Sequence, residues 1–130
     1  MKAKLRKITI DSKKYLYHLR INYYSPSKTH CLTLKIFQSQ QKATPLIIDF
    51  LTADNYFLGQ PLNVGVTLPN SNTNEEVRVN LHEPKYIREL ILLGLKNGWT
   101  GTNKLPIQNG LQYLAKLGFD VNSIIPENSH

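Results

Sequence analysis

The chain has 130 residues, of which 41% are hydrophobic and 19% are charged, a composition typical of one globular domain spanning residues 1–130 and not of a disordered segment. No run of about 18 apolar residues occurs that could cross a membrane, and the basic start of the chain lacks the apolar core of a secretion signal. The single cysteine, Cys31, excludes an internal disulfide framework and a zinc-finger spacing. We therefore expect a cytoplasmic protein without metal or cofactor, and no membrane partner.

The formal charge of +7 is unevenly distributed along the chain. Residues 1–42 hold ten Lys or Arg and one acidic residue, whereas residues 43–130 hold six Lys or Arg and eight acidic residues. Such asymmetry is typical of proteins with an anionic partner, such as nucleic acid or an acidic protein surface. It is also typical of a lysine-rich sheet edge that resists aggregation. Composition leaves both interpretations open.

Alternation of apolar and polar residues predicts a series of short strands in the first 81 residues. In chain order the predicted strands are 8–10, 15–23, 31–37, 46–51, 62–68 and 77–81. Turn residues separate them, with Asp11 to Lys13 as the first tight turn. Residues 53–61 are expected to be a loop that exposes Tyr56 and Phe57. Short strands joined by short polar loops favour an antiparallel meander.

The period changes to that of a helix after residue 83. Pro84 suits the first turn of a helix, and an apolar stripe follows up to Leu95. Asn97 and Gly98 end this helix, and Trp99 is expected to fold back onto it. The spacing of Ile107, Leu111, Leu114 and Leu117 predicts a second, short C-terminal helix. The expected class is α+β: an antiparallel meander of about five to six strands, then a helix packed on one face, then the second helix.

The sequence shows no constellation typical of catalysis or metal binding, so it favours a non-enzymatic protein. His30 and Cys31 are adjacent and would point to opposite faces of a strand, which prevents a thiolate–imidazole pair. The four histidines have no ligand spacing. Asp49 lies in the most apolar strand, where we expect it to pair with a Lys or Arg of a neighbouring strand, with catalysis as the alternative.

Binding is the function that remains, and two sets of residues are candidates for it. Cations on strand positions opposite the main apolar set could line one face of the sheet, and two aromatic residues lie in the central loop. The candidates are Lys14, His18, Arg20, Lys35, Arg78, Tyr56 and Phe57. The sequence favours a protein–protein interaction module, for example of the immunity type, that binds another protein or itself. The alternative is nucleic-acid binding through the basic N-terminal strands.

Several motifs together resemble a family of small uncharacterised bacterial proteins. They are the hairpin Ile8-Thr9-Ile10-Asp11-x-Lys13-Lys14-Tyr15, the segment Asn80-Leu81-His82-Glu83-Pro84, the helix ending in Asn97-Gly98-Trp99, and Ile107-Gln108-Asn109-Gly110-Leu111. The resemblance covers most of the chain, with the helix and its Asn-Gly-Trp end as the specific part. It implies a bacterial cytosolic origin and a sheet followed by helices. It implies no activity, cofactor or site residue.

Overall fold

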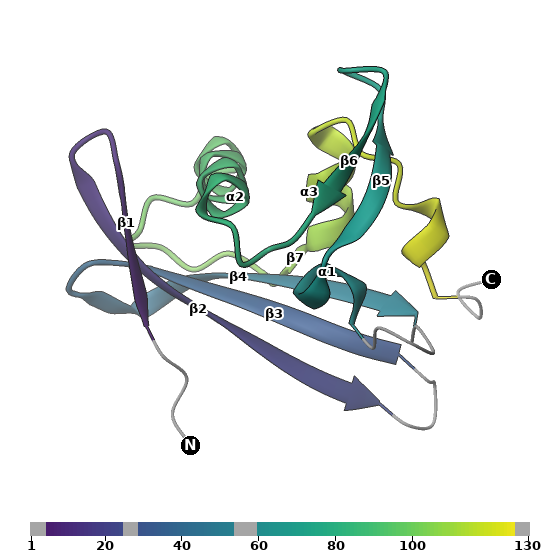
Figure 1. Ribbon diagram of the computed structural model, residues 1–130. Coiled ribbons are helices and arrows are strands. Elements are labelled where there is room, and N and C mark those ends of the chain that lie inside the picture. The colour runs from purple at the N-terminus through teal and green to yellow at the C-terminus, as the bar shows by residue number, and fades with distance from the viewer. Residues whose placement is uncertain (1–4, 25–28, 54–59, 127–130) are drawn as a thin grey trace.

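The computed structural model describes residues 5–24, 29–53 and 60–126 (Figure 1). The fold is α+β, and its main sheet has five strands in the order β1-β2-β3-β4-β7. The strands β1 (Arg6–Ile10), β2 (Lys13–Tyr24), β3 (Thr29–Gln38) and β4 (Gln41–Ala53) form the antiparallel meander. The fifth strand, β7 (Gln108–Asn109), pairs with β4 in parallel. The first four strands predicted from alternation are therefore confirmed.

The turn between β1 and β2 was predicted at Asp11 to Lys13 and consists of Asp11 and Ser12, because Lys13 already pairs with Ile10 as the first residue of β2. Both turn residues have positive φ, 50° and 71°. A two-residue turn with both φ angles positive has the twist that antiparallel strands require. Asp tolerates this backbone region better than most side chains do.

The prediction of a strand at 62–68 is wrong for the first half of that range. Residues Pro61–Val64 form one helical turn, α1, because Pro61 suits the first helical position and the Gln60 side chain accepts a hydrogen bond from Leu62 N at 2.7 Å. The strand that follows, β5 (Val66–Asn70), pairs with β6 (Glu75–Val79) in a separate two-stranded sheet. This hairpin does not extend the meander.

The predicted main helix is confirmed as α2 (Pro84–Lys96). Its end is a Schellman motif: Trp99 N–H donates to Gly94 O at 3.0 Å and Gly98 N–H donates to Leu95 O at 3.2 Å. Gly98 has φ 109°, a conformation that residues with a side chain rarely adopt. The C-terminal helix α3 (Gly110–Lys116) is followed by a 3-10 turn, η1 (Asn122–Ile124).

One face of the main sheet carries the hydrophobic core. In Figure 1 the helices α1, α2 and α3 and the β5–β6 hairpin all lie on the same side of strands β2, β3 and β4. Leu34, Ile48 and Phe50 point to that side and are fully buried, as are Leu90 of α2 and Leu114 of α3. The helix thus covers one sheet face, as predicted, and the other face of the sheet has no helix against it among the described residues.

Candidate functional site

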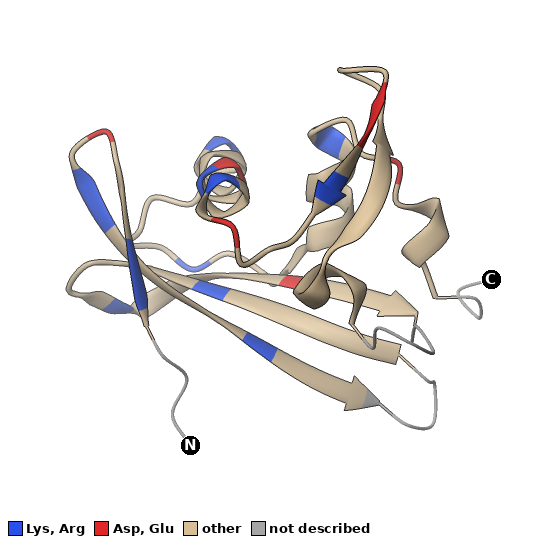
Figure 2. Ribbon diagram, in the orientation of Figure 1, with Lys and Arg blue, Asp and Glu red and all other residues tan. Residues whose placement is uncertain are grey.

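The sheet face that points away from the helices gathers most of the predicted cationic residues. We call it the open face. Strand alternation and register assign to it Lys7, Lys14, Leu16, His18, Arg20, Asn22, Cys31, Thr33, Lys35, Phe37, Ile47, Asp49 and Leu51. His18 lies directly opposite Lys35, and Arg20 lies directly opposite Thr33. Figure 2 shows Lys or Arg on both β2 and β3. We call the part of the open face formed by these two strands, with Lys14, His18, Arg20, Lys35 and Phe37, the cationic half.

The cationic half is built around Phe37. The Lys35 ammonium lies 5.5 Å from the centroid of the Phe37 ring, and the His18 ring lies 6.4 Å from it. Burial lowers the pKa of His18, and the positive charges of Lys35 and Arg20 lower it further. His18 Nδ1 is buried and has no hydrogen-bond partner among the described residues. At neutral pH His18 is therefore uncharged, and the charge of this half comes from Lys and Arg.

Asp49 was expected to pair with a Lys or Arg of a neighbouring strand, and its partner in the structure is a different residue. Its Oδ1 accepts a hydrogen bond from the Thr33 hydroxyl at 2.7 Å. The register explains this, because Thr33 lies directly opposite Asp49 while Lys35 lies opposite Ile47. No Lys or Arg of the described chain forms an ion pair with Asp49. The Asp49 side chain is only partly buried.

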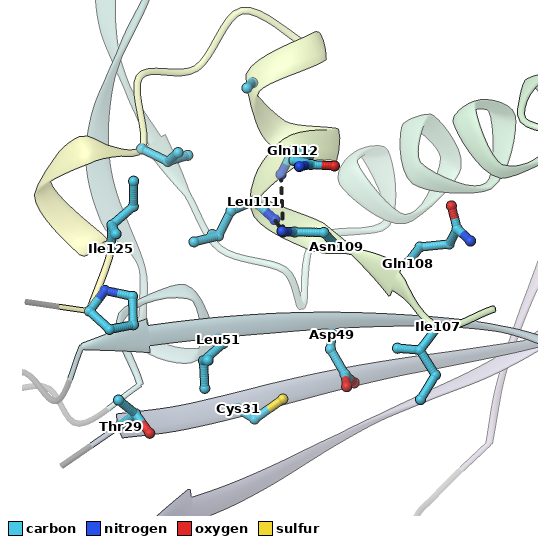
Figure 3. A pocket seen from close by; sticks show the side chains of 13 residues that line it. Thr29, Cys31, Asp49, Leu51, Ile107, Gln108, Asn109, Leu111, Gln112 and Ile125 are labelled. Carbon is cyan, nitrogen blue, oxygen red and sulfur yellow. Dashed lines mark hydrogen bonds between the residues drawn. The ribbon is translucent and has the colours of Figure 1, made fainter. Parts of the chain in front are cut away.

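A groove of about 870 Å³ runs along the edge of β4, between side chains of the open face and those of α3 (Figure 3). We call it the β4–α3 groove. Its lining is mostly apolar and comes from β3, β4, the segment before α3, α3 itself and the C-terminal turn. The lining residues are Thr29, Cys31, Asp49, Leu51, Ile107, Gln108, Asn109, Leu111, Gln112, Ala115, Val121, Ile125 and Pro126. Asp49 is the single charged residue in this set.

The start of α3 is fixed against β4 by local sequence features. Asn109 pairs with Asp49 in the parallel ladder, and its side-chain oxygen accepts from Leu111 N at 3.0 Å and from Gln112 N at 3.3 Å. An Asn cap of this kind defines where a helix begins. The next residue, Gly110, lies so close to the Phe50 ring that an added Cβ would overlap it. The Asn-Gly pair therefore places α3 at the edge of β4.

Cys31 lines the groove but is a poor nucleophile. Burial raises the pKa of its thiol, the hydrogen bond with Thr33 lowers it, and the Asp49 carboxylate raises it again, with a net increase. The thiol is protonated at neutral pH, whereas nucleophilic attack requires the thiolate. His30 points to the opposite face, where its ring lies 4.6 Å from that of Tyr23. This agrees with the prediction that these neighbours do not form a catalytic pair.

Of the other predicted site residues, the structure describes Arg78, which does not join the open face. Arg78 lies on β6 in the separate hairpin, where its Nη2 donates to Val64 O at 2.9 Å. Tyr56 and Phe57 lie outside the described residues. The groove itself was not predicted, because its two sides are separated by more than 55 residues of sequence. The Asn109-Gly110 pair is the one local signal that could have indicated a helix start at a close packing contact.

Neither the described residues nor known proteins point to a metal site, a membrane span or a family for this chain. Within residues 5–24, 29–53 and 60–126 no three His, Cys, Asp or Glu residues gather in a way that could hold a metal ion. None of the described helices has the length and apolar character needed to span a bilayer. Comparison of the chain with protein-family models, curated proteins and solved structures gave no match. The resemblance to a bacterial family therefore stays a prediction.

Proposed function

We propose that this protein is a non-enzymatic binding module that uses the open face to engage another protein. The observation that carries the proposal is the asymmetry of the sheet, which packs one face against helices and leaves the other without a layer among the described residues. That second face is not simply polar. It combines apolar Leu16, Ile47 and Leu51, the last of which is 44% exposed, with Arg20 and Lys35.

The mixture of side chains indicates the chemistry of the partner. Apolar groups interspersed with arginine are typical of the centre of protein interfaces. Lys7, Lys14, Arg20 and Lys35 lie on this face, and these cations favour a partner surface that carries carboxylates. Their alignment on adjacent strands, about 5 Å apart, would give such a surface a fixed register.

A charge reversal on the open face tests the proposal. Arg20→Glu combined with Lys35→Glu is expected to abolish recovery of partner proteins in affinity purification from the native host, because it replaces two attractive charges with two repulsive ones. The matched control is Arg88→Glu combined with Lys96→Glu, which makes the same charge change on exposed positions of α2. Both variants should keep the denaturation midpoint of the wild type.

Three results would contradict the proposal. The first is recovery of the same proteins by wild type and by the open-face variant. The second is equal loss of those proteins in the control on α2, which would indicate that net charge alone drives recovery. The third is recovery of wild type without any co-purifying protein, across growth conditions.

The second candidate function is binding of single-stranded nucleic acid. It is favoured by one specific observation, the placement of Lys14, Arg20 and Lys35 on one open sheet face. Fluorescence anisotropy with a labelled single-stranded oligonucleotide would then show binding that weakens steeply between about 50 and about 200 mM salt, because phosphate contacts release counterions. Absence of binding at the lower salt concentration excludes this function.

A further inference from the structure

The β4–α3 groove has the dimensions and lining of a small-molecule site. Its volume of about 870 Å³ falls within the range of about 300–1,000 Å³ that ligand pockets occupy. Figure 3 shows Asp49, Leu51 and Cys31 on its sheet side, Leu111 and Gln112 on α3, and Ile125 at its far end. Its mostly apolar lining with few polar groups is the usual composition of a site that binds an organic ligand.

The groove is preformed, because regular structure holds both of its sides. The sheet side is the antiparallel ladder of β3 and β4, in which Cys31 pairs with Leu51 and Thr33 with Asp49. The helix side is anchored by the β4–β7 pairing. The Tyr113 hydroxyl also donates to Gln108 Oε1 at 3.0 Å and ties α3 to the strand before it. A ligand would therefore lose little affinity to ordering of the site.

The charge of the groove selects the ligand. The protein as a whole has a formal charge of +7, yet Asp49 is the one charged residue among the described residues that line this groove. Thr33 orients the carboxylate through Oδ1 and leaves it without a cationic partner among the described residues. Two cations share its sheet face, Lys35 one strand away on the diagonal and Arg20 two strands away in the same row, and neither forms an ion pair with Asp49 among the described residues.

We propose that the β4–α3 groove binds a small organic amine, with its ammonium group on the Asp49 carboxylate and its apolar body against Leu51, Ile107 and Leu111. An ammonium donates charge-assisted hydrogen bonds to a carboxylate. The exposed apolar groups give the body its contact area, since Ile107 is 61% and Leu51 44% exposed. A carboxylic acid of the same shape would be repelled by Asp49. This inference does not depend on the proposed protein partner.

The test uses three probes that differ only in their polar end: 4-phenylbutylamine, 4-phenylbutanol and 4-phenylbutyrate. Titration of the isotope-labelled full chain, followed by amide chemical shifts, should show changes at residues 49–51 and 107–112 for the amine. The amine should bind about five- to tenfold more tightly than the alcohol, as expected for a partly solvated hydrogen bond to a charged group. The butyrate should bind more weakly than the alcohol.

Asp49→Asn isolates the role of the charge, because the amide keeps an oxygen to accept from Thr33. This variant should lose the preference for the amine over the alcohol. The matched control Glu76→Gln removes an exposed carboxylate on β6 and should keep the preference.

Several results would overturn the inference. They are equal binding of amine and alcohol to wild type, retention of the preference in Asp49→Asn, shift changes confined to other parts of the chain, and no binding of any probe. A peptide with one lysine between apolar residues serves as a fourth probe in the same titration. If it binds more than about tenfold more tightly than the amine, the groove recognises a protein segment and the assignment to a small molecule is wrong.

Discussion

Trp99 is the side chain whose removal should damage this fold most. It is 1% exposed, its ring lies 5.9 Å from that of Tyr15 on β2, and its Nε1 donates to Thr44 O at 3.1 Å. Truncating a large buried aromatic costs about 3–5 kcal/mol. The unpaired Thr44 carbonyl adds about 1 kcal/mol. Since a domain is stable by about 5–15 kcal/mol, Trp99→Ala should lower the melting temperature by about 10–20 °C or unfold the protein.

Chemical denaturation followed by far-ultraviolet circular dichroism measures this loss. Trp99→Phe is the informative control, because it keeps an aromatic ring against Tyr15 and removes the hydrogen bond to Thr44. We expect it to cost about 1–2 kcal/mol, for the lost hydrogen bond and part of the ring. A midpoint for Trp99→Ala equal to that of wild type would show that the indole is not packed against the sheet, and would refute the reasoning.

Two further predictions concern the site. Gly110→Ala should destabilise the protein by about 1–3 kcal/mol, because the new methyl group overlaps the Phe50 ring. Thermal unfolding measures this loss of stability, with Ala115→Gly as the control. An unchanged midpoint for Gly110→Ala would contradict the close contact between Gly110 and Phe50. The pKa of His18 in the folded state lies below its ordinary value of 6.5, so the unfolded state takes up the proton first as the pH falls. Neutral His18 therefore contributes stability above about pH 6.5, and this contribution is lost as the pH falls below that value. Denaturation at about pH 7.5 and about pH 5 should therefore show a smaller loss in His18→Gln than in wild type, and identical losses would contradict the lowered pKa.

The cationic half of the open face could be predicted from the sequence, because strand periodicity alone places alternate residues on one side. Lys14, His18, Arg20 and Lys35 occupy such positions on two strands that follow each other in the chain. Arg78 shows the limit of this reasoning. Its strand has the same alternation, but alternation does not say to which sheet a strand belongs, and β6 pairs only with β5.

The sequence by itself determined the elements whose signals are local. Period-two alternation defined the first four strands, and Pro84 at the start and Gly98 after the end defined α2, because a cap and a turn are fixed by a few adjacent residues. Only the tertiary structure decided what no local pattern encodes. It placed the two-residue strand β7 parallel to β4, and it brought Asp49 and Leu111 to opposite sides of one groove. Contacts between distant segments depend on how whole faces pack, and many packings are compatible with the same local periodicity.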